Sequence, residues 1–506
     1  MSLPRVSKTA VRVRRHIMAI IGLASMLLLA GCTVGPKYVR PPAATPPAYK
    51  EAGNWKTAQP SDQSLRGNWW EIFQDPQLNA LEEQVTISNQ NLKVAQAQYT
   101  QARALVRFNR AAYFPTVAVA PSVTRTKVSG NRPPQTSIFN GRTNTDFQLP
   151  VEFAYEVDAW GQVRRNVESF REQAQASAAD LATVNLSAHA QLALFYFEAR
   201  SLDAQEQLLN STVQAYEQAL QLNQTRFEGG VGSEVEVEQA KTQLETTRAQ
   251  AIDVGVARAQ FEHAVAVLIG KPPASFSLPP LPLSTPPPPV PAGVPSELLE
   301  RRPDIASSER LMAAANARIG VAKAAYYPLI NLTGDGGFES GTITTLLQGP
   351  SGFWSVGVSA FQTVFDAGRR RAASDQAIAV YDQTVATYRE TVLTGFQQVE
   401  DNLAALRILE KEAQTQNEAV IAAQKSLDLS IQRYKGGVTS YLEVTVAQSA
   451  ALSDEVTAVN ILGRRMVAAV QLIQALGGGW DSASLPQRPE CCGKLASSGC
   501  SGDSCK

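Results

Sequence analysis

The residues that could carry chemistry are few and widely separated. Histidine occurs only at His16, His189 and His263, and the cysteines lie at Cys32 and near the end of the chain. No Ser-His-Asp set, phosphate-binding loop or metal-ligand spacing can be assembled from these residues. The sequence therefore predicts no enzyme, no metal site and no cofactor. His189 and His263 lie within helical patterns and are expected to be packing or surface residues.

The charge balance argues against a nucleic-acid partner. The chain has 46 basic and 46 acidic residues, and its first 32 residues hold five basic residues and no acid. The remainder carries 41 basic against 46 acidic residues, a formal charge of −5. A nucleic-acid-binding protein would show a basic excess. The 44% of hydrophobic residues is enough to build a core.

The N-terminus has the form of an export signal. Basic residues at Arg12, Arg14 and Arg15 precede an apolar stretch at 17–30, which is too short to span a bilayer as a helix. The stretch ends in Leu29-Ala30-Gly31-Cys32, which resembles a bacterial lipoprotein box. We expect residues 1–31 to be removed and Cys32 to be lipidated, for example with palmitate. An ordinary signal peptide with a chance cysteine is the alternative.

The tail at 481–506 carries the other four cysteines, Cys491, Cys492, Cys500 and Cys505. Their spacing is not that of a CxxC metal site. A disordered or disulfide-tied tail is favoured over a metal-binding one.

The chain contains a duplication. Ala111-Ala112-Tyr113-Phe114-Pro115 recurs as Ala324-Ala325-Tyr326-Tyr327-Pro328, and Arg226-Phe227-Glu228-Gly229-Gly230-Val231 recurs as Arg433-Tyr434-Lys435-Gly436-Gly437-Val438. A proline-rich segment at 271–303 joins the halves and is expected to be stiff and extended. The predicted organisation is an N-terminal segment at 32–75, a first repeat at 76–270, this linker, and a second repeat at 304–480.

Each repeat contains a very long helix. Residues 162–228 lack Gly and Pro, and only Gly395 interrupts 369–435. Each helix would run about 100 Å, and it needs partners along its length. Shorter helices are expected to supply them, at 76–112, 233–269, 304–325 and 440–476.

The ends of the long helices predict two tight helical hairpins. Gly229-Gly230 and Gly436-Gly437 can end a helix in a left-handed cap. Ser233 with Glu236, and Ser440 with Glu443, then form two candidate capping boxes that start the next helices. These Ser and Glu residues could serve capping alone.

Four strands are expected before the long helices, at about 115–127, 146–158, 329–338 and 353–365. Residues 147–157 alternate apolar with polar or acidic side chains, and each strand could cross an outer membrane at a tilt. We expect a bulge at Pro150, because proline has no backbone N–H to donate to a neighbouring strand. Four strands cannot close a membrane barrel, whereas three copies would give twelve. The alternative is a soluble β-layer with one wet face.

Motifs at five places resemble the outer-membrane efflux lipoproteins related to OprM and TolC (NodT-type outer membrane factors). They are Cys32–Tyr38, Pro41, Trp69–Leu78, Leu298–Ile305 and Leu476–Trp480. The resemblance implies a mainly α-helical trimer with a 12-stranded outer-membrane β-barrel, four strands per chain, continuous with a long periplasmic α-helical barrel. The implied function is a passive exit duct for drugs or other small toxic compounds.

The resemblance also implies partners and a gate. The hairpins would form the periplasmic tip, which meets an adaptor (membrane fusion) protein and an inner-membrane pump, of RND type. Tip and gate candidates are Glu236, Glu238, Tyr434, Leu442, Glu443 and Val446. Many relatives carry Asp where this chain has Val446. We therefore hypothesise an apolar neck closed with the help of Leu442, and any acidic ring would come from Glu443, Glu236 or Glu238.

Two other functions share some of these features. A periplasmic adaptor also has a long helical hairpin, but it has one hairpin and no duplicated long helix with amphipathic strands. A type I protein-secretion channel would have the same fold with a different cargo. The lipoprotein box and Trp69-Trp70 favour small-molecule efflux.

Overall fold

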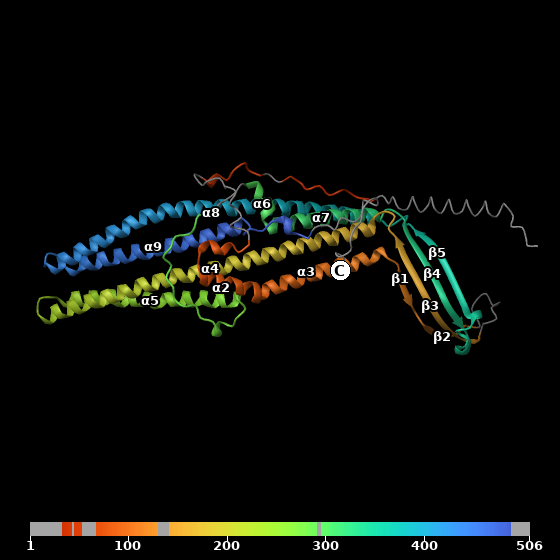
Figure 1. Cartoon of the computed structure of the whole chain (residues 1–506), viewed down its shortest axis with the longest axis horizontal. Coiled ribbons are helices and arrows are strands. Elements are labelled where there is room, and N and C mark those ends of the chain that lie inside the picture. Colours follow the sequence, from red (N-terminus) through yellow and green to blue (C-terminus); the bar gives the residue numbers. More distant parts are fainter. Residues whose placement is uncertain (1–32, 43–44, 53–66, 130–140, 291–294, 487–506) are drawn as a thin grey trace, which may run out of the picture. The chain divides into compact units, whose positions relative to one another are not determined.

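The computed structural model describes residues 33–42, 45–52, 67–129, 141–290 and 295–486 (Figure 1). The expectations for the signal peptide, for Cys32 and for the tail cysteines concern residues outside this described part. The chain divides into two compact units, which are described separately. The first comprises the described residues of 1–42, 99–176 and 308–388, and the second those of 43–98, 177–307 and 389–506.

The first unit contains an antiparallel sheet to which both repeats contribute. Its strands are β1 (Thr116–Val119), β2 (Ser122–Lys127), β3 (Thr143–Val157), β4 (Leu329–Ser340) and β5 (Gly352–Phe361). β1 and β2 both pair with β3, which is followed by β4 and β5, so the sheet has one free edge at β1–β2 and another at β5.

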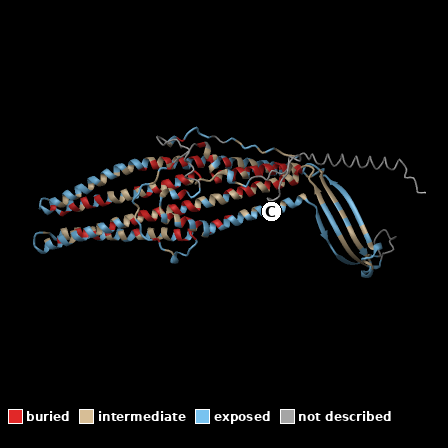
Figure 2. Cartoon of the chain, in the orientation of Figure 1, coloured by how far each residue is buried: buried red, intermediate tan, exposed pale blue. Residues whose placement is uncertain are grey.

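The sheet is largely exposed (Figure 2). The strand register places a row of exposed apolar side chains on one face, as the predicted alternation requires. They include Val117, Val119, Val151, Phe153, Trp354, Val356 and Val358.

The single strand expected at about 115–127 is wrong, because two prolines interrupt its ladder. The Ala120 N–H donates to the Pro150 carbonyl at 3.3 Å, but neither Pro121 nor Pro150 has an N–H to donate. The register is unchanged on both sides of the gap, so the expected bulge at Pro150 is also wrong. Pro150 fits because it faces Gly337, where an added Cβ would lie 2.8 Å from the Pro150 Cα.

The other strand ends differ from expectation by a few residues. β3 begins at Thr143 and β4 continues to Ser340, whereas β5 ends at Phe361 instead of about 365. β5 ends there because its partner β4 begins at Leu329, directly after Pro328, so no donor continues the ladder.

The two long helices, α4 (Gln162–Glu228) and α8 (Arg369–Lys435), are confirmed at both ends. A duplicated aspartate caps each one. Asp158 accepts hydrogen bonds from two N–H groups of α4 at 3.0 and 2.9 Å, and Asp366 accepts from Gly368 and from the second residue of α8 at 3.1 and 3.2 Å. The repeated Asp-Ala sequence is therefore a helix-start signal.

The single helix expected at 76–112 is also wrong. The structure has α2 (Pro76–Ser88) and α3 (Gln90–Arg110), separated at Asn89. Asn89 is extended, and its side chain accepts from the Leu92 N–H at 3.0 Å and donates to the Leu268 carbonyl at 2.8 Å. Asn89 thus caps α3 and ties it to the end of the neighbouring helix, which outweighs continued helix formation.

Three further helices match the expected ranges within one residue at each end. They are α5 (Glu234–Leu268), α7 (Pro303–Ala324) and α9 (Tyr441–Ala475). By length and composition α9 could cross a membrane, but much of it is buried inside the second unit. The expectation that 271–303 is wholly extended is wrong, because α6 (Pro295–Arg301) lies within it. Its first residue, a proline, is compatible with a helix start.

The glycines inside α5 and α9 have different roles. A Cβ at Gly463 would lie 2.4 Å from the Ser201 hydroxyl of α4, whereas nothing lies within 4 Å of a Cβ at Gly255. Gly463 therefore allows α9 and α4 to approach closely. At Gly255 no close neighbour requires the absence of a side chain.

A buried cluster fixes the proline-rich segment to the second unit. One carboxylate oxygen of Asp203 accepts from Arg200 and from the Leu281 N–H, both at 2.8 Å, and the other accepts from Arg258 at 3.0 Å. Arg200 also donates to the Pro279 carbonyl at 2.6 Å. The segment is thus held by charged side chains of α4 and α5 rather than by helical packing.

A second buried cluster joins α2 to α4. His189 Nδ1 lies 2.6 Å from a carboxylate oxygen of Glu82, and Trp70 stacks on the imidazole with ring centroids 4.4 Å apart. Thr86 Oγ1 lies 3.4 Å from His189 Nε2. Burial raises the pKa of Glu82 to about 9 and lowers the pKa of His189 to about 4. The expected packing role of His189 is confirmed.

Candidate gate at the helical hairpin turns

The two hairpin turns have the same backbone geometry. Gly230 and Gly437 have φ of 72° and 70°, the left-handed conformation expected for them. The next residue donates back into the helix in both turns, from Val231 to the Arg226 carbonyl and from Val438 to the Arg433 carbonyl, each at 2.9 Å. These bonds close a Schellman-type cap. Gly229 and Gly436 are not left-handed.

Only one of the two expected capping boxes forms. Ser233 accepts from the Glu236 N–H at 3.4 Å, and the Glu236 carboxylate accepts from the Ser233 N–H at 3.3 Å. Ser440 makes no side-chain cap, and Glu443 is exposed. The expected Ser440–Glu443 box is therefore wrong. Its place is taken by burial of Tyr441, which anchors the first turn of α9.

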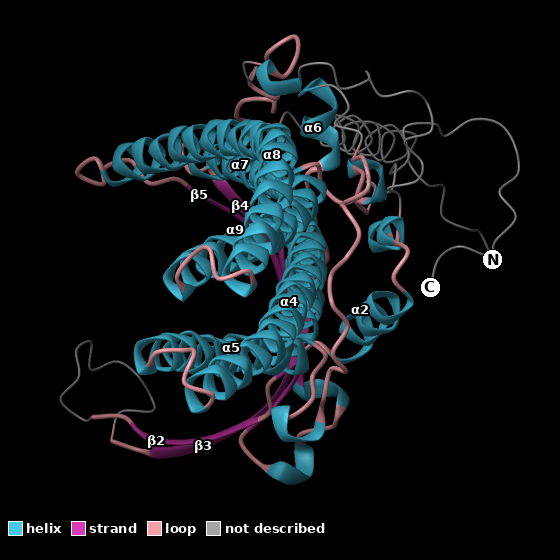
Figure 3. Cartoon of the chain, turned by 90° about the vertical axis from the view of Figure 1, so that its left-hand side faces the viewer, coloured by secondary structure: helices cyan, strands magenta, loops and turns pink. Residues whose placement is uncertain are grey.

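Figure 3 looks onto the turns of the two hairpins, α4–α5 and α8–α9. The buried Tyr434 of α8 contacts residues of both hairpins. Its hydroxyl donates to the Asn223 side-chain oxygen at 2.5 Å and lies 3.3 Å from a Glu236 carboxylate oxygen. The Arg226 guanidinium lies 4.9 Å from the centre of the Tyr434 ring, and the Tyr441 ring lies 5.2 Å away. We call these five residues the clasp.

The clasp combines an apolar cluster with a polar network. Ala240, Tyr434, Tyr441 and Val444 form a buried cluster, so residues of both hairpins share one small core. Burial, followed by the Glu236 charge, raises the pKa of Tyr434, and burial raises the pKa of Tyr441 to about 12. Both hydroxyls therefore stay protonated at neutral pH, and that of Tyr434 can donate.

The other gate candidates do not join the clasp. Leu442, Glu443 and Val446 are exposed side chains on α9, with Leu442 and Val446 on the same helical face. Glu238 is exposed on α5. Of the candidate acids, only Glu236 contacts Tyr434.

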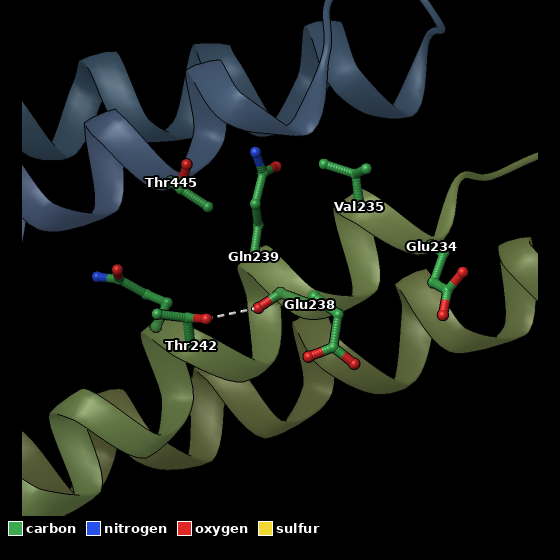
Figure 4. A pocket seen from close by; sticks show the side chains of 7 residues that line it. Glu234, Val235, Glu238, Gln239, Thr242 and Thr445 are labelled. Carbon is green, nitrogen blue, oxygen red and sulfur yellow. Dashed lines mark hydrogen bonds between the residues drawn. The ribbon is translucent and has the colours of Figure 1, made fainter.

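A groove of about 580 Å³ lies between α5 and α9 close to the turns. Val235 and Gln239 point across it toward the helix that carries Thr445, whereas Glu234 and Glu238 point away (Figure 4). Gln243 also lines the groove and donates to Ser449 of α9 at 3.1 Å. The groove thus has a mixed apolar and amide lining with acidic groups beside it.

Sequence reasoning selected Tyr434 and Glu236 but missed Asn223, Arg226 and Tyr441. The duplication carried a usable signal. The counterpart of Tyr434 in the first repeat is Phe227, which lacks the hydroxyl and is exposed. The hydroxyl that distinguishes the two positions is the one that meets Asn223 and Glu236.

A duplicated pair of long helices, a sheet with an exposed apolar face, and paired helical turns together define a channel component of the outer membrane. The model of the outer membrane efflux protein family matches residues 81–271 and 294–478, which correspond to the two repeats. The chain belongs to this family.

Relatives named as efflux or export proteins of the outer membrane match nearly the whole chain. The chain is 32% identical over 465 residues to the probable efflux pump outer membrane protein TtgC of Pseudomonas putida, covering 91% of this chain and 96% of the relative. It is 30% identical to the pyoverdine export outer membrane protein OpmQ of Pseudomonas aeruginosa, again covering 91% and 96%.

Solved structures agree with the fold. The outer-membrane channel OprN superposes with a TM-score of 0.83 at 30% identity, covering 89% of this chain and 100% of the other. VceC of Vibrio cholerae superposes with a TM-score of 0.76 at 27% identity, covering 82% and 99%. This protein is therefore an outer-membrane efflux component with a large periplasmic portion, and the expected fold class and outer-membrane location are confirmed.

Proposed function

We propose that three copies of this chain form a passive exit duct for small toxic compounds, with no catalytic step of its own. The observation that carries this proposal is the sheet with two free edges and one exposed apolar face. The sheet is four strands wide, because β1 and β2 lie one after the other along the same edge of β3. A sheet of this width is too narrow to close on itself, but joining β5 to the β1–β2 edge of the next copy makes a ring. Three copies give the twelve-strand circumference that leaves a lumen.

The lipid anchor at Cys32 is part of the same proposal. Thr33 is the first described residue, and a Cβ at Gly161 would lie 2.9 Å from its side chain. The neighbouring Val34 N–H donates to the Trp160 carbonyl at 3.1 Å. Thr33 and Val34 therefore lie against the segment between β3 and α4, at the end of the sheet where a lipid anchor on the preceding residue would be needed if the sheet spans the membrane.

One measurement tests the assembly and the anchor together. Native mass spectrometry of the protein extracted in detergent is expected to give three chains, each lacking residues 1–31 and carrying acyl chains on Cys32. A stable monomer contradicts the ring, and an unmodified N-terminus contradicts the anchor. The two outcomes are separate, because a ring of strands does not require acylation.

We further propose that the clasp holds the periplasmic end of the duct closed. Opening requires the hairpins to separate, and the Tyr434 hydroxyl is a direct polar link between them. The exposed Leu442, Glu443 and Val446 remain candidates for the surface that lines the neck. Glu236 is engaged by its cap and by Tyr434, so Glu443 and Glu238 are the better candidates for an acidic ring.

Tyr434→Phe is expected to increase the open population of the channel several-fold. Loss of this hydrogen bond costs about 1 kcal/mol in each chain and leaves Asn223 without its donor. Single-channel recording in planar bilayers measures the effect as more frequent or larger openings. Tyr381→Phe is the matched control on α8, because its hydroxyl has no hydrogen-bond partner among the described residues. Equal conductance and open probability for all three proteins would rule out the clasp as a gate.

The partners proposed from this geometry are a periplasmic adaptor and an inner-membrane pump of RND type. Val231 and Val438 are exposed at the two turns, and the α5–α9 groove lies beside them. Apolar side chains beside a groove suit a protein partner. The names of the relatives, which include toluene, antibiotic and pyoverdine efflux, favour small-molecule cargo.

A further inference from the structure

The two most exposed large apolar side chains of the described residues lie just beyond the sheet. Val364 is 92% exposed and Phe365 is 85% exposed, directly after β5. The antiparallel register places the end of β5, the start of β4, the end of β3 and the start of β1 at one end of the sheet. Phe114, before β1, is exposed at this end as well.

Aromatic residues also occupy the remaining crossings. Trp160, after β3, stacks on Tyr327, before β4, with ring centroids 4.9 Å apart. The Trp160 indole N–H donates to the Pro328 carbonyl at 2.8 Å. Every passage between helix and strand at this end therefore carries an aromatic side chain.

Basic residues lie in the same sequence segments as these aromatics. We define the collar as residues 107–116, 157–166, 321–329 and 361–371, which contain eight basic and two acidic residues, a net charge of +6. Both acids are already paired, Asp158 with Arg164 at 2.9 Å and Asp366 with Arg370 at 2.6 Å.

Five basic side chains of the collar make no ion pair with any residue that the structure describes. They are Arg107, Arg110, Lys323, Arg369 and Arg371, and all but Lys323 are exposed. The chain after residue 32 carries 41 basic against 46 acidic residues, so this local excess opposes the overall charge.

We propose that the collar binds anionic phospholipid headgroups at the periplasmic surface of the outer membrane. The inference rests on the proposed membrane-spanning role of the sheet. Aromatic rings favour the boundary between acyl chains and headgroups, and unpaired arginines at that depth meet lipid phosphates. The collar would fix the depth of the sheet and retain a shell of anionic lipid.

A second copy of the chain is a poorer occupant of this surface. Copies related by a rotation axis lie at the same level, so each collar would face another collar of the same charge. Like charges repel at short range. A lipid phosphate supplies the opposite charge at the required depth.

The test is native mass spectrometry of the full chain in detergent, with phosphatidylglycerol or phosphatidylethanolamine added. The collar variant is Arg369→Gln with Arg371→Gln. The matched control is Lys411→Gln with Lys425→Gln, which removes the same charge from exposed positions further along α8. We expect phosphatidylglycerol to bind wild type more tightly than phosphatidylethanolamine does, and its affinity to fall about 30-fold in the collar variant only.

Other results would overturn the proposal. Equal phosphatidylglycerol affinity of wild type and collar variant, or an equal loss in the control variant, removes the collar as the binding surface. If Phe365→Ser separates the subunits while lipid affinity is unchanged, the surface is a subunit interface. A lipid-free spectrum that shows only monomer instead counts against the proposed function, so the two failures are distinguishable.

Discussion

Asp203→Ala is expected to destabilise the second unit by about 3–5 kcal/mol, the usual cost of removing one partner from a buried ion pair. The Asp203 side chain has no exposed surface, and the Arg200 side chain is only 2% exposed. Without the carboxylate, Arg200 and Arg258 lose a neutralising partner and the Leu281 N–H loses its acceptor. The buried Arg200 is then left without a charged partner, whereas the partly exposed Arg258 keeps Glu262.

Glu217→Ala is the matched control for this prediction. Glu217 also links α4 to an arginine of α5, Arg248, at 2.7 Å, but both side chains of that pair are exposed. Exposed pairs contribute little to stability. The thermal midpoint of the helical circular dichroism signal in detergent should therefore fall clearly for Asp203→Ala and hardly at all for Glu217→Ala.

Proteolysis adds a local readout to the same comparison. Release of the segment at 271–290 is expected to speed its cleavage in Asp203→Ala but not in Glu217→Ala. Similar midpoints and cleavage rates for the two variants would show that the Asp203 cluster does not hold the segment.

The long helices could be predicted from the sequence because glycine marks their ends and proline is absent within them. The limits of α4 and α8 coincide with Gly161, Gly229, Gly368 and Gly436. The break at Asn89 could not be predicted, because it depends on a hydrogen bond to Leu268, which is far away in sequence. The split of the first strand was missed although Pro121 lies within the expected range; its second cause, Pro150, lies in the partner strand.

The candidate site was predictable only in part. Matching Gly-Gly motifs located both turns, and the turns adopt the expected caps. The two Ser-x-x-Glu patterns look alike in the sequence, yet one forms a box and the other does not. The difference comes from tertiary packing, because Tyr434 and Tyr441 pack together beside Glu236 and bury the start of α9.

Above about pH 6.5 the contact between α2 and α4 is expected to lose stability, because Glu82 and His189 share one buried proton. With a pKa of about 9 for Glu82 and about 4 for His189, the folded pair holds one proton between these values. Whichever of the two groups carries the proton, the count for the pair is the same.

Proton counting in the unfolded chain gives the sign of the effect. With ordinary pKa values of 4.5 and 6.5, the unfolded pair binds two protons below pH 4.5, one between 4.5 and 6.5, and none above. Stability falls with rising pH where the folded state binds more protons. The contribution of the pair therefore rises up to about pH 4.5, is flat to 6.5, and then falls by roughly 1 kcal/mol per pH unit toward pH 9.

Glu82→Gln isolates this effect, because an amide fills the same space and does not titrate. Above pH 6.5, neither state of the variant takes up a proton at this site, so its α2–α4 contact should be independent of pH there. Hydrogen exchange of α2 amides, corrected for the intrinsic pH dependence and compared with α9 amides of the same sample, measures the local opening free energy. Between pH 6.5 and 9 this free energy should fall in wild type and stay level in Glu82→Gln. Parallel curves for the two proteins would mean that the folded pair holds no proton above pH 6.5, on Glu82 or on His189, and would overturn the shared-proton prediction.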